Sequence, residues 1–399
     1  MTSIAGKRIL LGLTGGIAAY KSAELVRLLV KAGCDVRVVM TEAACRFITP
    51  VTLQALSGQT VWTDLWDGRV ADNMGHIELS RDRDLIVIAP ASADFMAKLA
   101  HGLADDLLST LCMARDCALM LAPAMNRQMW DNAATQRNAR QLREDGVLFA
   151  EPESGAQACG ETGVGRMREA AQICEEVEAF FQPKVLAGKR LLLTAGPTLE
   201  PIDPVRAITN SSSGKMGYAL AKAAREAGAQ VTLVSGPTAL DTPVGVQRID
   251  VSTAAEMLAA VKKAIPAADI FVAVAAVADY RVLAPSEQKI KKKAGAGMTL
   301  ELAENPDILG YVAGLAKRPF CVGFAAESEN LAANARQKRA RKKIPLLAAN
   351  LAQQALGADD NAITLFDDEG EHALARGPKI EVARAMVRHI AAMLAKRKR

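Results

Sequence analysis

The chain has 399 residues, of which 50% are apolar and 4% aromatic, and its formal net charge is +5. This length predicts two or three domains, and the composition is that of a globular protein without a bias toward disorder. Because the terminal "KRKR" carries four positive charges, the remainder is nearly neutral and gives no reason to expect a nucleic-acid partner. The longest apolar run, Ile270–Ala278, is far too short to cross a membrane.

The N-terminal residues "MTSIAGKRILLGLTGG" lead straight into a predicted strand and lack the pattern of a signal peptide. Seven cysteines are scattered along the chain without the spacing of a disulfide framework or of a zinc site. Together these features predict a cytoplasmic protein with reduced thiols and no structural zinc.

An internal repeat predicts the architecture. The segment "GKRILL" at Gly6–Leu11 returns as "GKRLLL" at Gly188–Leu193. Each copy is followed by a glycine-containing turn, an amphipathic helix and a second strand, which is the opening βαβ unit of a doubly wound α/β domain. The predicted fold class is therefore α/β, with two tandem Rossmann-like domains and parallel sheets. The domains are expected at 1–182 and 188–399.

Two glycines, Gly15 and Gly16, follow the first strand and precede a helix predicted to begin at Ile17. Such a turn lets backbone N–H groups and the positive end of the helix dipole face an anion. Because the G-x-G-x-x-G spacing is absent, a mononucleotide such as FMN is favoured over NAD or FAD. The alternative is a plain tight turn. Buried strands are predicted to follow at 84–92 and 118–126.

Three side chains in the first half are candidates for chemistry. His76 begins a predicted helix, Asn126 follows a predicted strand, and Cys159 lies in the glycine-rich "SGAQACGETGVGRM". The histidine and the asparagine could simply cap helices, and the cysteine could be an ordinary surface thiol. A glycine-rich flap can instead close over a substrate and exclude water, and a neutral thiol can give up a proton near neutral pH.

The loop at 194–217 in the second half is longer than its counterpart in the first half. Ligands of open α/β sheets bind at the carboxyl ends of the strands, so we predict that this is a binding loop. Its "SSSGKMG" is not a P-loop, because Met216 stands where Ser or Thr is needed and Thr209 where the first glycine is needed. Buried strands are predicted at 269–280, 320–327 and 344–350.

Asp279 ends the predicted strand at 269–280, and four lysines lie within 289–293. A run of charges is usually a solvated face, but lysines also suit a triphosphate whose charge must be offset as pyrophosphate leaves. Beyond Arg376 a terminal helix without a recognisable site is expected.

Four ordered segments of the first half resemble the motifs of flavin-dependent cysteine decarboxylases: "GGIAAYK", "PASADFMAKLAHGLADDLLS", "PAMNRQMW" and "ACGETGVGRM". In the second half, "RAITNSSSGKMG" resembles a ligase signature, R-x-I-x-N-x-S-S-G-K-M-G, with Arg206, Asn210 and Lys215 in register. The whole chain resembles the bacterial bifunctional coenzyme A biosynthesis family. In that family a phosphopantothenoylcysteine decarboxylase is fused to a phosphopantothenate–cysteine ligase.

The resemblance implies that the first domain binds FMN and converts phosphopantothenoylcysteine into 4'-phosphopantetheine. A carboxylate β to a thiol leaves only if the carbanion has an electron sink, which transient oxidation of the thiol provides. By this resemblance, His76 assists the oxidative half of the decarboxylase reaction, Asn126 binds the substrate carboxylate, and Cys159 donates the final proton. The implied cofactor-binding residues are Gly15, Gly16, Ile17, Thr41 and Ser92.

For the second domain, the resemblance implies that CTP and 4'-phosphopantothenate form an acyl-cytidylate, which the amine of cysteine converts into an amide. Asn210 would hold the acyl phosphate and Lys289 would act as pyrophosphate leaves, while Mg2+ would be held largely through the nucleotide phosphates. The implied substrate and nucleotide contacts are Arg206, Ala273, Val274, Ala275, Asp279, Lys289, Asn305, Pro306, Asp307, Ile308, Phe324, Lys338 and Lys342.

The resemblance also implies a homo-oligomer, with trimeric contacts through the first domain and dimeric contacts through the second, a combination that can give a dodecamer. Small molecules are the expected partners, without nucleic acid or membrane. One rival interpretation is a pyridine-nucleotide oxidoreductase, against which the missing G-x-G-x-x-G argues. Another is a non-catalytic flavoprotein, in which loss of His76 or Cys159 would be expected. A third is a chain with only one active half.

Overall fold

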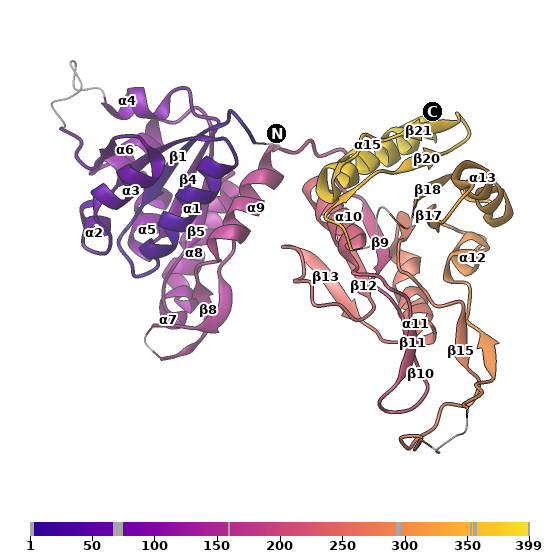
Figure 1. The fold of residues 1–399 in the computed structure, drawn as a ribbon. Helices are drawn as coiled ribbons and strands as arrows, with labels where there is room; N and C mark the ends of the chain where they lie inside the picture. Colours follow the sequence, from indigo (N-terminus) through magenta and orange to yellow (C-terminus); the bar gives the residue numbers. More distant parts are fainter. Residues whose placement is uncertain are drawn as a thin grey trace. The chain divides into compact units, whose positions relative to one another are not determined.

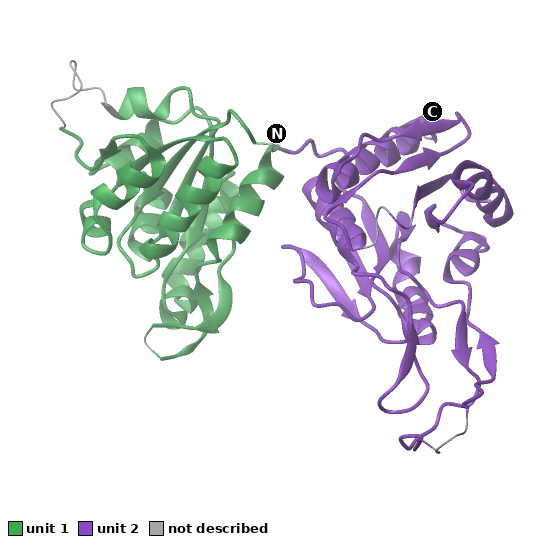
Figure 2. Cartoon of the chain, viewed as in Figure 1, with its two compact units in different colours: residues 1–181 green, residues 182–399 purple. Residues whose placement is uncertain are grey.

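The computed structural model describes residues 4–66, 75–158, 160–292, 297–351, 353 and 357–397. The chain divides into two compact units, Met1–Phe181 and Gln182–Arg399 (Figure 2). Each unit has its own large sheet with helices on both faces, as predicted for tandem Rossmann-like domains (Figure 1). Within the described part of the chain, no helix combines the length and the apolar character that a membrane span needs.

The first unit is built on a six-stranded parallel sheet in the order β3-β2-β1-β4-β5-β6. The strand order reverses between β1 and β4, and this is the position at which doubly wound folds bind ligands. The strands are β1 (Arg8–Leu13), β2 (Asp35–Met40), β3 (Val61–Trp62), β4 (Leu85–Ala91), β5 (Ala118–Pro123) and β6 (Leu148–Phe149). The helices are α1 (Ala19–Lys31), α2 (Glu42–Cys45), α3 (Pro50–Ser57), α4 (Gly75–Ser80), α5 (Ala93–His101), α6 (Leu107–Ala114), α7 (Arg127–Asp131), α8 (Ala133–Glu144) and α9 (Ala170–Phe181).

The central strands of this sheet are apolar on both faces because helices cover both faces. In β1, Ile9 and Leu11 belong to a core cluster that includes residues of α1 and α9. Leu10 belongs to a second cluster, which includes residues of α5 and α6. The continuous apolar sequence of β1 therefore follows from burial on two sides, as expected for a central parallel strand.

An antiparallel hairpin of β7 (Glu153–Ala156) and β8 (Thr162–Arg166) carries the glycine-rich segment of the first unit. Gly165 has a φ of +134°, and a Cβ at this position would lie 2.5 Å from the carbonyl oxygen of Met125. Only glycine fits both the dihedral angle and the space. The Met125 N–H donates to the Gly165 carbonyl oxygen at 3.0 Å, so the hairpin lies directly against the segment that follows β5.

The second unit contains an eight-stranded sheet in the order β13-β12-β9-β14-β17-β18-β20-β21. The six strands from β13 to β18 are parallel, and they repeat the strand order of the first unit. They are β9 (Arg190–Ala195), β12 (Gln230–Ser235), β13 (Val246–Asp250), β14 (Ile270–Ala273), β17 (Phe320–Glu327) and β18 (Leu346–Leu351), followed by β20 (Thr364–Phe366) and β21 (Glu371–Ala373). The helices are α10 (Lys215–Glu226), α11 (Ala254–Ala264), the short 3-10 helix η1 (Ile265–Ala267), α12 (Ile308–Ala313), α13 (Leu331–Lys342) and α15 (Lys379–Arg397).

The predicted doubly wound parallel arrangement is confirmed for the six strands from β13 to β18, and the sheet then continues into an antiparallel edge. There β20 pairs antiparallel with β18, and β21 pairs antiparallel with β20. The physical reason is the short connection between β20 and β21, since a tight turn can join only antiparallel neighbours, whereas parallel strands need a crossover.

The predicted strand at 269–280 is also interrupted, because β14 ends at Ala273. Beyond it the backbone bonds to the loop after β9. The Ala276 N–H donates to the Gly196 carbonyl oxygen at 2.9 Å, and the Ala278 N–H donates to Thr198 Oγ1 at 3.0 Å. The chain thus turns across the carboxyl edge of the sheet.

Small two-stranded sheets lie outside the main sheet: β10 (Leu199–Pro201) with β11 (Ala207–Thr209), β15 (Tyr280–Val282) with β16 (Leu302–Glu304), and β19 (Asp360–Asn361) with β22 (Gly377–Pro378).

The predicted terminal helix is confirmed as α15, which packs against α10. Between them the buried guanidinium of Arg384 donates to both carboxylate oxygens of Glu226, at 2.7 and 2.9 Å. This contact fixes α15 on the outer face of the second unit's core.

Candidate active sites

The first-unit pocket is a cavity of about 410 Å³ at the carboxyl ends of β1, β4 and β5. Three strand ends supply its lining, because each is followed by a loop that turns toward the same edge of the sheet. Five of the residues predicted from sequence lie in this lining, namely Gly15, Gly16, Ile17, Ser92 and Asn126.

One end of the first-unit pocket suits a phosphate group. Helix α1 begins here without a side-chain cap and with no acidic residue in its first turn, so its positive end is unopposed. A Cβ at Gly16 would meet nothing within 4 Å, which shows that the turn is open on that side. These features fit the phosphate of a mononucleotide.

Thr41, also predicted to bind the cofactor, is not in the lining of the first-unit pocket. It is the N-cap of α2, and its hydroxyl oxygen accepts from the Ala44 N–H at 3.2 Å. This cap orders the segment that packs on the glycine turn, because a Cβ at Gly15 would lie 2.6 Å from the Ala43 Cβ. Thr41 therefore acts on the glycine turn indirectly, by ordering the segment that packs against it.

The β7–β8 hairpin covers another side of the first-unit pocket. It is held on α7 by a hydrogen bond of 3.0 Å from the Arg127 N–H to Gln157 Oε1, and by one of 2.9 Å from Gln128 Nε2 to Glu161 Oε1. Gln157 and Ala158 line the pocket. Cys159 itself lies outside the described residues, and it follows directly after these two.

Asn126 and His76 differ in how the structure places them. Asn126 lines the pocket and caps α7, since its Oδ1 accepts from the Met129 N–H at 3.0 Å. His76 lies on α4, which packs against α6, and it is not in the pocket lining. Its Nδ1 is buried and has no hydrogen-bond partner among the described residues. The single chain therefore does not bring His76 and Asn126 into one pocket.

The second unit has two adjoining pockets at the carboxyl edge of its sheet. The serine-loop pocket, of about 450 Å³, contains Asn210–Gly217 in its lining, and the Asp279 pocket, of about 470 Å³, contains Asp279 and Asn305–Leu309. Four residues line both pockets, which places the two cavities side by side: Ala275, Val277, Phe324 and Lys338.

The serine-loop pocket is rich in groups that bind anions. Lys215, Lys338 and Lys379 line it, together with the backbone of the loop that leads into α10. Lys215 pairs with Asp359 at 2.6 Å, and Lys379 donates to the Ala358 carbonyl oxygen. Burial lowers the pKa of Lys379, because the charged form loses hydration.

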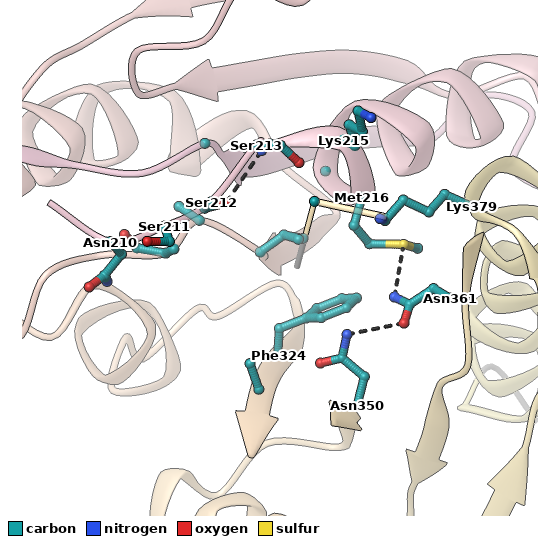
Figure 3. Close-up of a pocket in the computed structure, with 18 of the residues that line it drawn as sticks. Asn210, Ser211, Ser212, Ser213, Lys215, Met216, Phe324, Asn350, Asn361 and Lys379 are labelled. Carbon is teal, nitrogen blue, oxygen red and sulfur yellow. Dashed lines mark hydrogen bonds between the residues drawn. The ribbon is translucent and has the colours of Figure 1, made fainter. Parts of the chain in front are cut away.

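The far wall of the serine-loop pocket is polar (Figure 3). There Asn350 Nδ2 donates to Asn361 Oδ1 at 3.2 Å, and Asn361 Nδ2 in turn points to the sulfur of Met216 at 3.6 Å (Figure 3). Phe324 lies beside these groups and separates them from the Asp279 pocket. Asn210 Nδ2 donates to the carbonyl oxygens of Ala276 and Val277, both at 3.2 Å, and so holds the segment after β14.

The Asp279 pocket contains most of the predicted nucleotide contacts: Ala273, Ala275, Asp279, Asn305, Pro306, Asp307, Ile308, Phe324, Lys338 and Lys342. Val274 lines the serine-loop pocket instead. Asn305 Nδ2 donates to the Ala278 carbonyl oxygen at 2.9 Å, whereas its Oδ1 is buried without a partner among the described residues. A buried acceptor of this kind requires a donor, and a ligand in the pocket can supply it.

Two cations of α13 face the Asp279 pocket. Lys338 Nζ donates to the Phe324 carbonyl oxygen at 2.9 Å, and burial lowers the pKa of Lys338. Lys342 pairs with Asp307, the N-cap of α12. Burial acts to raise the pKa of Asp307, but the hydrogen bonds from Lys342 and from the Gly310 N–H outweigh it and lower this pKa.

Arg206 and Lys289 are not in the lining of either pocket. The Arg206 guanidinium bonds to the buried carboxylate of Asp203 and, at 2.7 Å, to the Ile290 carbonyl oxygen. Arg206 therefore anchors the residue next to Lys289. Lys289 is exposed.

Sequence reasoning missed several lining residues. Lys379, Asn350 and Asn361 come from elements far along the chain from the serine loop, and no local pattern marks them. Lys21, which lines the first-unit pocket, was missed as well. This buried lysine donates to the Met167 carbonyl oxygen at 2.8 Å and to Glu169 Oε1 at 2.9 Å. Only the rarity of a buried lysine signals such a residue, and burial is not visible in a sequence.

Comparison with known proteins gives two family matches. Residues 1–182 match the model of the flavoprotein family, and residues 186–394 match that of the DNA/pantothenate metabolism flavoprotein C-terminal domain. Three relatives carry the name Coenzyme A biosynthesis bifunctional protein CoaBC. The protein of Vibrio cholerae is 52% identical, over 97% of this chain and 98% of its own length. That of Escherichia coli is 50% identical over 93% of each chain, and that of Bacillus subtilis is 43% identical over 97% of each. The chain belongs to the family of bifunctional coenzyme A biosynthesis proteins.

Proposed function

We propose that this chain joins 4'-phosphopantothenate to cysteine in its second unit and decarboxylates the product to 4'-phosphopantetheine in its first unit. As a member of its family it is a bifunctional enzyme of coenzyme A biosynthesis, with a flavoprotein decarboxylase and a ligase. We assign the decarboxylase to 1–182 and the ligase to 188–399. The junction of the two second-unit pockets is the observation that carries the ligase assignment.

A ligase of this kind must bring a carboxylate and a nucleotide together at one point. The serine-loop pocket, with its three lysines, suits the acid, and the Asp279 pocket suits the nucleotide. The carboxylate oxygen attacks the α-phosphorus of CTP as the bond to pyrophosphate breaks, which forms a mixed anhydride. The amine nitrogen of cysteine then attacks the acyl carbon, and the bond to CMP breaks. Lys338, which lines both cavities, can offset charge at the point of reaction.

Asn305 fits a nucleotide whose base carries an exocyclic amino group, as CTP does. Its partnerless amide oxygen can accept from the exocyclic amino group of cytosine, and its own amide is held by the Ala278 carbonyl oxygen. A site that requires a donor rejects bases that lack one at that position, because its buried acceptor would remain unpaired. Mg2+ would enter with the nucleotide phosphates, and the carboxylate of Asp279 in the lining is a suitable hard oxygen ligand.

We propose that Asn210 and Lys289 act on the acyl-cytidylate and on the leaving pyrophosphate. Asn210 lines the serine-loop pocket and lies against the segment at Ala276 and Val277, next to the shared wall. Lys289 precedes the residue that Arg206 and Asp203 anchor. Arg206 therefore supports the ligase as a positioning residue for the lysine segment.

For the decarboxylase, we propose that FMN occupies the first-unit pocket with its phosphate at Gly15–Ile17. When bound, FMN supplies a reversible store for the electrons of the substrate thiol. Asn126 binds the substrate carboxylate from the end of α7, and Cys159, carried by the β7–β8 hairpin, donates the final proton. His76, which the chain itself does not bring to this pocket, would reach it from a neighbouring copy in a homo-oligomer. We place this oligomer in the cytoplasm, with trimeric contacts through the first unit and dimeric contacts through the second.

The Cys159→Ser variant tests the decarboxylase assignment. A serine hydroxyl is a much weaker acid than a thiol, so we expect CO2 release with an unreduced product and loss of 4'-phosphopantetheine. FMN content and CTP-dependent pyrophosphate release should match the wild-type values. Cys117→Ser, at a partly buried thiol outside the pocket, serves as the matched control. Normal 4'-phosphopantetheine formation by Cys159→Ser would contradict the assignment.

A further inference from the structure

A cluster of two histidines and one aspartate lies outside the pockets of the second unit. Asp367 follows β20, His372 is in β21 and His389 is in α15. Their ligand atoms all lie within 4.8 Å of one another. None of the three residues lines the serine-loop pocket or the Asp279 pocket, so the proposed ligase reaction does not use them.

Both histidines present the same ring nitrogen to the carboxylate. His372 Nε2 lies 3.0 Å from Asp367 Oδ1, and His389 Nε2 lies 2.8 Å from Asp367 Oδ2. The centroids of the two rings lie 4.7 Å apart, with the ring planes tilted by 51°. Two imidazoles that converge on one carboxylate from different elements form a donor set typical of zinc and related transition metals.

Hydrogen bonds within the chain fix the orientation of the Asp367 carboxylate without a metal ion. Asp367 Oδ1 accepts from the N–H groups of Glu369 and Gly370, at 2.8 and 3.2 Å, so the turn between β20 and β21 holds its orientation. Such hydrogen bonds to a ligand carboxylate are the usual support of a metal centre. The Asp367 side chain is 2% exposed, whereas those of His372 and His389 are 34% and 21% exposed. The cluster is therefore anchored on its inner side and open to solvent on its outer side.

We propose that Asp367, His372 and His389 bind a divalent transition-metal ion, Zn2+, with water as the fourth ligand. Metal–ligand distances of about 2.0–2.2 Å in a tetrahedral site require ligand atoms roughly 3.3 Å apart. The observed nitrogen–oxygen separations of 3.0 and 2.8 Å go to different carboxylate oxygens, and the ligand atoms lie within 4.8 Å of one another, so metal binding requires a modest rearrangement of these side chains. Each imidazole binds as the neutral ring through Nε2, and its proton resides on Nδ1.

The ion would connect the β20–β21 hairpin to the C-terminal helix. These elements already share ion pairs around the turn, for example Lys396 with Glu369 at 2.5 Å. A ligand that binds only the folded state stabilises that state by mass action, so the role of the site is structural. The proposal does not depend on the assignment of CTP or FMN.

Cobalt binding to the intact, untagged and reduced chain tests the site, because Co2+ reports its coordination through visible absorption. We expect the wild type to bind one Co2+ with the intense bands of a tetrahedral site, and Zn2+ to displace it. His372→Gln and His389→Gln should each weaken binding roughly a hundredfold, at least as much as the loss of a supporting contact does. His101→Gln, at an exposed histidine of the first unit, is the matched control and should bind like the wild type.

Three results would overturn the proposal. They are absence of Co2+ and Zn2+ binding by the wild type at micromolar concentrations, unchanged binding by both cluster variants, and a sulfur-to-cobalt charge-transfer band that reveals thiol ligands. Far-UV circular dichroism of each variant shows whether it is folded. If the wild-type protein binds no metal in the titration, that result alone contradicts the proposal.

Discussion

Lys338 is the side chain on which the ligase proposal depends most. It lines both second-unit pockets, and its ammonium group is oriented by the carbonyl oxygen of Phe324. Burial lowers the pKa of Lys338 because the charged form loses its hydration. A phosphate at the junction would replace that lost stabilisation, so the residue is prepared for an anionic ligand before the ligand binds.

We expect Lys338→Met to slow CTP-dependent pyrophosphate release by roughly a hundredfold, since losing one preorganised donor at developing charge costs about that much. Lys317→Met, at an exposed lysine outside both pockets, is the matched control and should retain the wild-type rate. The decarboxylase should be unaffected in both variants. Equal ligase rates in the two variants would show that the reaction does not use the charge of Lys338.

Asp203 predicts a pH-dependent contribution to stability. The Arg206 guanidinium and the N–H groups of Val205, Arg206 and Ile290 hold the pKa of this buried carboxyl well below its usual range. A lowered carboxyl pKa stabilises the fold above the unfolded-state value of about 3.9, and this stabilisation declines progressively as the pH falls from that value toward the lower folded-state pKa.

Asp203→Asn should therefore lower the thermal unfolding midpoint of the second unit near pH 7. The deficit relative to the wild type should begin to shrink as the pH falls below about 3.9, because the stabilisation by the wild-type carboxylate declines there. Asp241→Asn, at an exposed aspartate, controls for loss of a surface charge and should show no deficit at either pH. A deficit of Asp203→Asn that persists unchanged in acid would mean that the charge of the carboxylate is not the cause.

The sequence predicts pocket residues well where each one directly follows a parallel strand. Gly15, Ser92 and Asn126 come after β1, β4 and β5, so topology alone brings them to one edge of the sheet. It fails for Lys379, whose position depends on how the C-terminal helix returns to the sheet. Nor does the sequence alone reveal that the guanidinium of Arg206 pairs with the buried carboxylate of Asp203.

At the scale of elements, the β7–β8 hairpin links the first-unit pocket to Cys159. Its attachment depends on close contact between the Gly165 backbone and the Met125 carbonyl group. Gly165→Ala should displace the hairpin, since a methyl group would have to occupy space already filled by that oxygen. We expect at least a tenfold loss of 4'-phosphopantetheine formation from phosphopantothenoylcysteine, as small misplacements of a catalytic group have large effects.

Gly58→Ala is the control for this prediction. Gly58 also has a positive φ, +68°, but a Cβ there would meet nothing within 4 Å. It therefore has the backbone strain without the clash, and its decarboxylase activity should stay near the wild-type value. A Gly165→Ala enzyme as active as Gly58→Ala would show that the hairpin need not be held in this position.

Elements with long apolar runs are predictable from the sequence, whereas very short ones are not. Strand β17 occupies Phe320–Glu327, the range that the sequence predicts. The strands β20 and β21 are only three residues long and flank an acidic turn, so the antiparallel edge is not foreseen. The same turn holds Asp367, and the proposed metal site is invisible in the sequence for this reason.

At the scale of the whole molecule, the two units have separate cores. Among the residues that the structure describes, two apolar clusters belong to the first unit and two to the second, and none of the four contains residues of both. We expect 1–181 and 182–399, produced as separate proteins, each to fold and to retain its own partial reaction. Calorimetry and separate assays of CO2 and pyrophosphate release check this. Loss of both activities on separation would show that the units depend on each other.

The most direct test of two consecutive reactions in one chain is mass spectrometry of products made by the purified, FMN-loaded protein. Supplied with 4'-phosphopantothenate, cysteine, CTP and Mg2+, the protein should form 4'-phosphopantetheine, CMP, pyrophosphate and CO2 in equal amounts. Omission of CTP should abolish all of them. If the complete mixture yields neither 4'-phosphopantetheine nor phosphopantothenoylcysteine, the account is contradicted.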